Sequence, residues 1–132
     1  MDAFDADVLI YAGRDNPAAG PLLALFEDHG SDDRVGSVLL IPELLSKPLR
    51  MGATEEVGLL AALLGRLDLY DVDRSIADAA SAFGAKYRLR AADAVHLATA
   101  VHVGADRFIT NNSRDFPKSI GEIEIVYPDD LA

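Results

Sequence analysis

The chain has 132 residues, enough for one domain, and half of them are hydrophobic, so it can bury a core of its own. Its 12 basic and 22 acidic side chains give a formal charge of −10, which argues against binding nucleic acid through a broadly basic surface and suits a cation site or a basic protein partner. Cysteine is absent, which excludes disulfides, thiolate nucleophiles and sulfur-bound zinc. The opening residues do not resemble a signal peptide and no long apolar run follows, so we expect a soluble cytoplasmic protein without membrane association.

Short strand-like runs alternate with helix-like runs along the sequence. In chain order, the pattern predicts a strand at 4–7 leading into the apolar run 8–12, a helix at 17–29, a strand at 34–36, a helix capped by Ser37 that carries the apolar residues of 38–45, a helix at 55–67, a strand at 69–72, helices at 75–87 and 91–103, and strands at 107–110 and 123–127. Pro42 falls in a first turn, where proline is tolerated, whereas Pro48 should kink or end its helix. Strands separated by helices favour a single α/β domain, spanning 1–132, with a central parallel sheet flanked by helices on both faces.

Acidic residues follow two of the predicted strands, at the ends where ligands bind in this class of fold. Asp5 and Asp7 end the first strand, and Asp115 follows the strand that ends at Thr110, within a polar turn. Because Asp5 and Asp7 alternate, we expect them to share one face of an extended strand, with Asp5 as the better candidate for the interior end. Turn chemistry alone also accounts for the asparagines and the serine of this polar segment.

Two further acids stand in apolar helical surroundings. Glu43 is a lone carboxylate within an apolar stretch, so it is either partnered or on an exposed stripe of its helix. Asp93 lies in the first turn of a helix of small apolar residues, where the helix dipole alone would favour a carboxylate. His96, three residues on, shares a face with Asp93 and is either its partner or a satisfied core histidine.

Together, Asp5, Glu43, Asp93 and Asp115 form a candidate set of oxygen ligands. Oxygen-only ligation selects Mg²⁺ or Mn²⁺ over zinc. Clustered carboxylates repel one another, and a bound cation relieves that repulsion while lowering the pKa of a bound water molecule. Such a site would hydrolyse a phosphodiester without a covalent intermediate.

The acids lie in four segments, at 4–12, 37–45, 92–100 and 104–116. In content and order these segments resemble the motifs of the PIN-domain family, and specifically those of the VapC-type toxins of bacterial toxin–antitoxin pairs. The segment 92–100 gives the most specific match to a family motif. The resemblance implies a PIN-like parallel sheet flanked by helices, cleavage of RNA with Mg²⁺ or Mn²⁺, a homodimer and a cognate antitoxin protein. It also implies that Asp5, Glu43, Asp93 and Asp115 are both the catalytic residues and the metal ligands, and that Asp7, Thr110 and Asn112 give polar support.

Basic residues stand beside two of these segments, although the overall charge is unusual for an enzyme that cuts RNA. Lys47 and Arg50 follow Glu43, and Arg88 and Arg90 precede Asp93. Our hypothesis is that these four side chains hold the RNA backbone locally. The alternative is ordinary charge at helix ends.

Three alternatives are weighed against a nuclease. The segment 4–9 also resembles the opening of haloacid-dehalogenase-like phosphatases, in which Asp5 would be a covalent nucleophile, but no matching lysine or late acidic pair follows. A receiver-type phospho-switch would need a lysine at the end of a late strand, where Thr110 is followed by Asn111. The third alternative is a PIN fold that only binds a partner, which the acidic charge of the chain would also suit. A nuclease assay with and without metal distinguishes this alternative from an enzyme.

Overall fold

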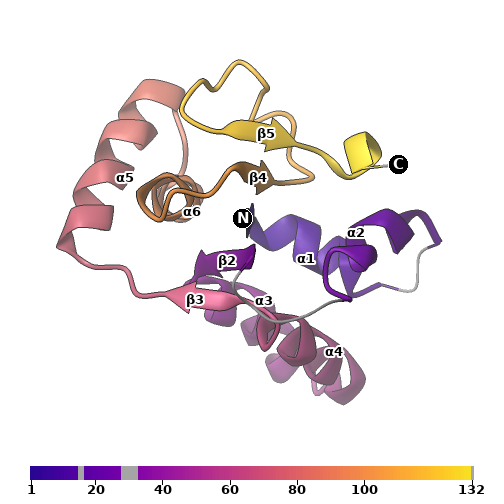
Figure 1. The fold of residues 1–132 in the computed structure, drawn as a ribbon. Helices are drawn as coiled ribbons and strands as arrows, with labels where there is room; N and C mark the ends of the chain where they lie inside the picture. Colours follow the sequence, from indigo (N-terminus) through magenta and orange to yellow (C-terminus); the bar gives the residue numbers. More distant parts are fainter. Residues whose placement is uncertain (15–16, 28–32, 132) are drawn as a thin grey trace.

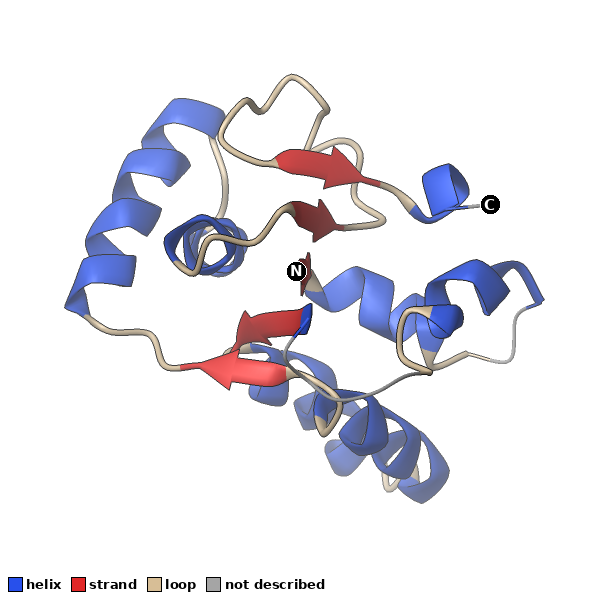
Figure 2. Ribbon diagram, viewed as in Figure 1, coloured by secondary structure: helices blue, strands red, loops and turns tan. Residues whose placement is uncertain are grey.

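The structure is a computed structural model, and it describes residues 1–14, 17–27 and 33–131. Within these residues a central sheet has five parallel strands in the order β3-β2-β1-β4-β5. The strands are β1 (Asp2–Phe4), β2 (Arg34–Ser37), β3 (Asp68–Tyr70), β4 (Arg107–Ile109) and β5 (Glu124–Val126). The predicted α/β class with a central parallel sheet is therefore confirmed (Figure 2).

Helices connect β1 to β2, β2 to β3 and β3 to β4, a loop connects β4 to β5, and the helices cover both faces of the sheet (Figure 1). They are α1 (Ala6–Ala12), α2 (Gly20–Ala24), α3 (Leu40–Arg50), α4 (Thr54–Leu64), α5 (Arg74–Tyr87) and α6 (Ala91–His102), with short 3-10 turns η1 (Pro17–Ala19) and η3 (Pro128–Leu131). No helix among the described residues is long and apolar enough to cross a membrane.

The alternation of side chains along the strands builds two cores, one on each face of the sheet. Residues of β1, β4 and β5 are paired in register, with Ala3, Phe108 and Ile125 in one row and Phe4, Ile109 and Val126 in the next. The first row packs in a core with α5 and α6, and the second row packs in a core with α1, α2, α3 and α4. The sheet is thus held from both sides, and its carboxyl ends have a fixed position relative to α1, α3 and α6.

The first strand is shorter than predicted and ends before Asp5. Asp5 is the N-cap of α1, with φ −86° and ψ 161°, and its side chain accepts the backbone N–H of Ala6. The apolar run 8–12 is therefore helical, with Val8, Leu9 and Ala12 facing the core at helical spacing. The prediction that Asp5 and Asp7 share one face of an extended strand is wrong, because a carboxylate N-cap starts the helix between them.

The second predicted helix and the start of the third also differ from the structure. Of the range 17–29, the described part holds η1 and the short helix α2, and residues 28 and 29 lie outside the described residues. Ser37 is the last residue of β2 rather than an N-cap, and its Oγ accepts the N–H of Leu39 at 3.1 Å before α3 begins at Leu40. Pro42 lies in the first turn of α3, as expected, whereas α3 runs two residues past Pro48 to Arg50.

Candidate functional site

The candidate site begins where β1 and β4 end side by side. The backbone N–H of Asp5 donates to the carbonyl of Ile109 at 3.0 Å, so the parallel pairing of β1 and β4 continues one residue beyond the strands. Thr110, the residue after β4, is completely buried and faces Asp5. The sheet thereby brings together two segments that are about a hundred residues apart in the chain.

Asp5 is a buried carboxylate with both oxygens hydrogen bonded. Its side chain is part of a residue that is only 3 % exposed; Oδ1 accepts the N–H of Ala6 at 2.9 Å, and Oδ2 accepts the hydroxyl of Thr110 at 2.9 Å. Burial, followed by the charge of Asp7, raises the pKa of Asp5 from 3.8 to about 7, against the opposing effects of His96 and of the two hydrogen bonds. Without a cation, this carboxyl is therefore much less fully ionised at neutral pH than an ordinary aspartate.

Asp7, Thr110 and Asn112 form a hydrogen-bonded rim beside Asp5. Oδ1 of Asp7 accepts the backbone N–H of Asn111 at 3.1 Å and lies 3.4 Å from the hydroxyl of Thr110. The backbone N–H of Asn112 donates to that same hydroxyl at 3.0 Å. Since Thr110 has one hydroxyl hydrogen and the contact to Asp5 is shorter, that hydrogen goes to Asp5. The contribution of Asn111 comes from its backbone, so no side-chain pattern could have indicated it.

Asp115 is held by a reciprocal contact with Asn112. Nδ2 of Asn112 donates to Oδ2 of Asp115 at 2.9 Å, and the backbone N–H of Asp115 donates to Oδ1 of Asn112 at 3.1 Å. This local turn leaves Asp115 only partly buried. Asn112 therefore holds the side chain of Asp115 in place, and its role as a support residue of the site stays a prediction.

Asp93 links the remaining acids electrostatically. It lies in the first turn of α6 and is partly buried. Its pKa is raised by burial first, then by the charges of Asp115 and Glu43, whereas His96 and Arg90 lower it. Carboxylates from α3 and from the loop after β4 therefore both act on Asp93 of α6.

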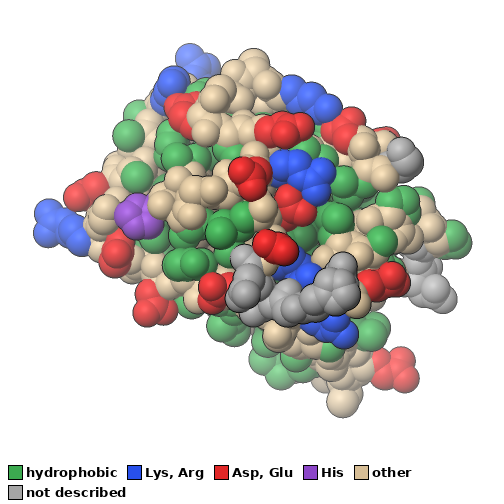
Figure 3. Space-filling model, viewed as in Figure 1, with side chains coloured by type: hydrophobic (Ala, Val, Ile, Leu, Met, Phe, Trp, Pro, Cys, Tyr) green, Lys and Arg blue, Asp and Glu red, His purple; other side chains and the backbone are tan. Residues whose placement is uncertain are grey.

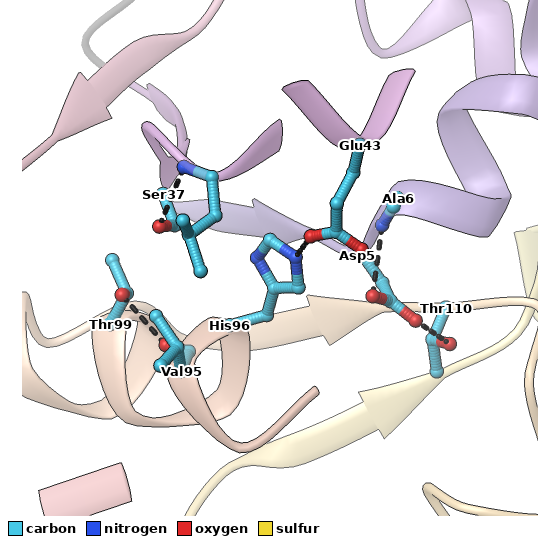
Figure 4. Close-up of polar contacts among 9 residues, drawn as sticks. Asp5, Ala6, Ser37, Glu43, Val95, His96, Thr99 and Thr110 are labelled. Carbon is cyan, nitrogen blue, oxygen red and sulfur yellow. Dashed lines mark hydrogen bonds and ion pairs between the residues drawn. The ribbon is translucent and has the colours of Figure 1, made fainter. Parts of the chain in front are cut away.

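Glu43 reaches α6 from the first turn of α3. Its Oε1 is hydrogen bonded to Nε2 of His96. The side chain of Glu43 is 32 % exposed, whereas the His96 residue is only 2 % exposed. In Figure 4, Glu43 and His96 point toward each other, and Asp5 and Thr110 form the neighbouring contact. Glu43 is thus partnered rather than free on an exposed stripe. The Glu43–His96 pair was not predicted, although His96 was expected on the Asp93 face of the helix.

The chemistry of these side chains suits a hard cation. They offer only carboxylate oxygens and one histidine, and mutual repulsion with burial raises the pKa of Asp5 and of Asp93. Among the described residues, however, no three His, Asp or Glu side chains stand in a geometry ready to coordinate one ion. The assignment of Asp5, Glu43, Asp93 and Asp115 as the ligands of a cation therefore stays a prediction.

The four basic candidates lie on exposed helix ends around these acids. Lys47 and Arg50 are in the last turn of α3, Arg88 is the left-handed C-cap of α5 with φ 57°, and Arg90 is the N-cap of α6. Within the part of the chain that the structure describes, Lys47, Arg50 and Arg88 make no ion pair. Figure 3 shows acidic and basic side chains interspersed over one face of the molecule.

A separate hollow lies away from this chemistry. It is lined by α1, α2 and α4, with mostly apolar side chains such as Leu23, Phe26 and Leu63, and it includes none of the four candidate acids. The acids themselves lie at the strand ends, in the position that parallel α/β folds use for ligands. The acids at the strand ends, and not the hollow, are therefore the candidate functional site.

Comparison with known proteins gives the same family along most of the chain. The model of the PIN domain matches residues 3–119. No curated protein is significantly similar in sequence. Among solved structures, the chain is similar to a toxin–antitoxin complex from Klebsiella pneumoniae, with a TM-score of 0.77 at 23% identity over 97% of this chain and 98% of that one.

Two further solved structures have the same fold. One is a DNA-bound VapBC from Salmonella typhimurium, with a TM-score of 0.77 at 17% identity over 97% of this chain and 98% of that one. The other is VapBC2 from Rickettsia felis bound to a DNA fragment from their promoter, with a TM-score of 0.74 at 16% identity over 96% and 97% of the two chains. At these identities the likeness establishes the fold and no more.

Proposed function

This chain belongs to the PIN domain family, and on that premise we propose that it is a Mg²⁺- or Mn²⁺-dependent endoribonuclease of the VapC type, the toxin of a toxin–antitoxin pair. The nuclease domain covers residues 1–132, and the protein acts in the cytoplasm. Family membership sets aside the phosphatase and receiver alternatives. The competing function within the family is a PIN fold that only binds a partner.

One observation carries the proposal. Glu43 on α3 is hydrogen bonded to His96 on α6, and the charge of His96 lowers the pKa both of the buried Asp5 and of Asp93, whose pKa is in turn raised by Glu43 and by Asp115 after β4. Proteins seldom gather carboxylates in partly buried surroundings without a compensating charge, because burial disfavours their ionised form. The position of the cluster beyond the strand ends also matches the place where parallel α/β folds bind ligands.

The residues of the chain have separable roles in this proposal. Asp5, Glu43, Asp93 and Asp115 would hold the cation, which supplies an activated water and charge stabilisation at the scissile phosphate. Thr110 and Ala6 fix the two oxygens of Asp5, and Asn112 orients Asp115. These contacts hold the carboxylates of Asp5 and Asp115 in place.

RNA would be held by the exposed basic residues around the acids. Lys47, Arg50 and Arg88 are free to contact phosphates, since the described residues offer them no ion pair. Arg90 lies close enough to Asp93 to lower its pKa, so its charge would act on the acids as well as on bound RNA. The charge of −10 elsewhere would repel RNA and confine binding to this region.

The proposed protein partners are a cognate antitoxin and a second copy of the chain. The solved structures with this fold include a toxin–antitoxin complex and two VapBC complexes, which supports an antitoxin partner. A basic antitoxin segment would compete with RNA for the acidic site and suppress cleavage in proportion to its occupancy.

A gel assay on labelled single-stranded RNA tests the proposal. Demetallated protein should be inactive, and added Mn²⁺ or Mg²⁺ should restore cleavage, with Asp5→Asn as the inactive variant and Lys118→Ala as a control outside the site. Cleavage that persists in chelator would remove the metal mechanism. Absence of cleavage of any RNA or DNA by remetallated protein would favour the partner-binding function.

A further inference from the structure

His96 makes an unusual contact for a buried residue of a central helix. The residue is 2 % exposed, yet its Nε2 reaches across to Glu43 on α3, a residue 53 positions earlier in the chain. It lies one turn after Asp93 on the same helix, so the two side chains share a face. The contact therefore joins the helix that carries one acid of the site to the side chain of another.

Thr99, one turn further along α6, shows what a purely structural polar residue does in this helix. It is equally buried, at 1 % exposure, and its hydroxyl donates to the carbonyl of Val95 in its own helix at 2.8 Å (Figure 4). His96 makes no such local bond. The only hydrogen bond of its side chain to the described residues is to a carboxylate of the candidate site, and its Nδ1 is buried without a partner.

The unpartnered Nδ1 also indicates which ring nitrogen carries the hydrogen. A buried N–H without an acceptor is costly, whereas a buried lone pair costs less, so the hydrogen belongs on Nε2, where Glu43 accepts it. A single donor to Oε1 occupies one oxygen of the carboxylate. The other oxygen, Oε2, is left for a different partner.

We propose that His96 is the positioning residue of the site, and that its Nε2–H holds Glu43 in the orientation in which the second carboxylate oxygen serves a divalent cation. This inference deepens the proposed function and rests on it. Glu43 has a long, partly exposed side chain with rotamer freedom that metal binding would otherwise have to remove. A buried hydrogen-bond donor fixes that freedom before the cation arrives, as outer hydrogen bonds to ligating carboxylates do in other metal sites.

The test compares His96→Met with His96→Gln, two unbranched side chains of similar size. Gln keeps an N–H donor near the position of Nε2, and Met has none. Mn²⁺ affinity is measured by isothermal titration calorimetry, and folding by thermal melts in chelator. We expect His96→Met to bind Mn²⁺ about 10- to 100-fold more weakly and His96→Gln to stay within about threefold of the wild type. Thr99→Val, on the same helix, is the matched control and should leave Mn²⁺ affinity unchanged.

Each outcome decides something. Equal Mn²⁺ affinity in His96→Met and wild type, or equal losses in the Met and Gln variants, overturns the positioning role and leaves the metal site standing. A wild-type protein that binds no Mn²⁺ overturns both this inference and the proposed function.

A second measurement covers the case in which His96→Met does not fold. In metal-free wild type, the Nε2 proton of His96 should give a slowly exchanging, downfield NMR signal that shifts when Glu43 is replaced in Glu43→Gln. A signal that does not respond to this substitution overturns the inference.

Discussion

The hydroxyl of Thr110 lies 2.9 Å from Oδ2 of Asp5, although the two residues are 105 positions apart. This contact joins the ends of β1 and β4, where the backbone N–H of Asp5 also bonds Ile109. The hydroxyl of Thr110 thus donates a hydrogen bond to a carboxylate whose ionised form is disfavoured by burial. Asp5 and Thr110 are both part of the proposed metal site, Asp5 as a ligand and Thr110 as its support.

Thr110→Val removes the hydroxyl while keeping the shape of the side chain. Because the hydrogen bond from Thr110 lowers the pKa of Asp5, it favours the ionised carboxyl, so its loss should be felt most where Asp5 is charged. We expect a loss of about 1.5–3 kcal/mol in the free energy of unfolding at pH 8.5 and a smaller loss at pH 5.5, measured by urea denaturation in chelator. Thr99→Val, whose hydroxyl bonds its own helix, should show no such pH dependence. Equal losses of Thr110→Val at both pH values would contradict the account.

Asp5→Asn should stabilise the metal-free protein above neutral pH. The pKa of Asp5 is raised from 3.8 to about 7 in the folded chain, so ionised Asp5 destabilises the fold increasingly from pH 4 to pH 7 and by a constant amount above that. A rise of about three pH units in the pKa of Asp5 corresponds to a gain of at most about 4 kcal/mol in the free energy of unfolding of the variant. Asparagine also remains a good N-cap for α1. Below pH 4 the variant and the wild type should unfold alike, as followed by urea denaturation across pH.

Asp106→Asn is the control for this pH series, because the ionised carboxyl of Asp106 stabilises the fold whereas that of Asp5 destabilises it. The amino terminus of Met1 lowers the pKa of Asp106 through a hydrogen bond, so ionised Asp106 favours the fold above its ordinary pKa and loses that effect as pH falls. Asp106→Asn should therefore never be more stable than wild type at neutral pH. If Asp5→Asn behaves like Asp106→Asn, the buried environment assigned to Asp5 is wrong.

Divalent cations should raise the melting temperature of the wild type, because a ligand that binds only the folded state stabilises it by mass action. At a Mn²⁺ concentration of about 100 times the dissociation constant, the gain is about 2.7 kcal/mol. Asp5→Asn and Asp93→Asn should lose most of this gain, whereas the exposed Asp129→Asn should keep it. A full metal response in both site variants, seen by differential scanning fluorimetry, would mean that the ligands are misassigned.

Lys47→Ala and Arg88→Ala should weaken RNA binding without affecting Mn²⁺ affinity. Each lost phosphate contact should reduce the slope of log affinity against log salt by about one unit, measured by fluorescence anisotropy with labelled RNA. Lys118→Ala, which removes an ion pair to Asp130 at 2.7 Å, should leave the slope unchanged. Arg90→Ala is a less clean variant, because Arg90 also lowers the pKa of Asp93. An unchanged slope in both test variants would place the RNA elsewhere.

The sequence was informative about the fold because its signals there are local. Apolar runs alternating with helical periodicity were enough to predict the parallel sheet, and the rule that ligands bind beyond strand ends selected Asp5 and Asp115. Asp93 stood out because α6 is otherwise small and apolar. The structure confirms the class of fold and gathers these residues at one end of the sheet.

The boundaries and the pairings could not be read in the same way. Asp5 ends a strand and caps a helix at once, and a run such as 8–12 fits either element by composition alone. Ser37 has the chemistry of an N-cap, but pairing with β3 keeps it in β2. The contact of His96 with Glu43 depends on how the fold places α3 relative to α6, which no short-range pattern specifies.

Anomalous diffraction from crystals grown with Mn²⁺ tests the central claim most directly, because it locates the cation itself. The account predicts one anomalous peak at the carboxyl ends of β1 and β4, about 2.1 Å from a carboxylate oxygen of Asp5 and from at least two of Glu43, Asp93 and Asp115. A peak that contacts none of these four residues, or no peak in crystals of protein that cleaves RNA, would contradict it.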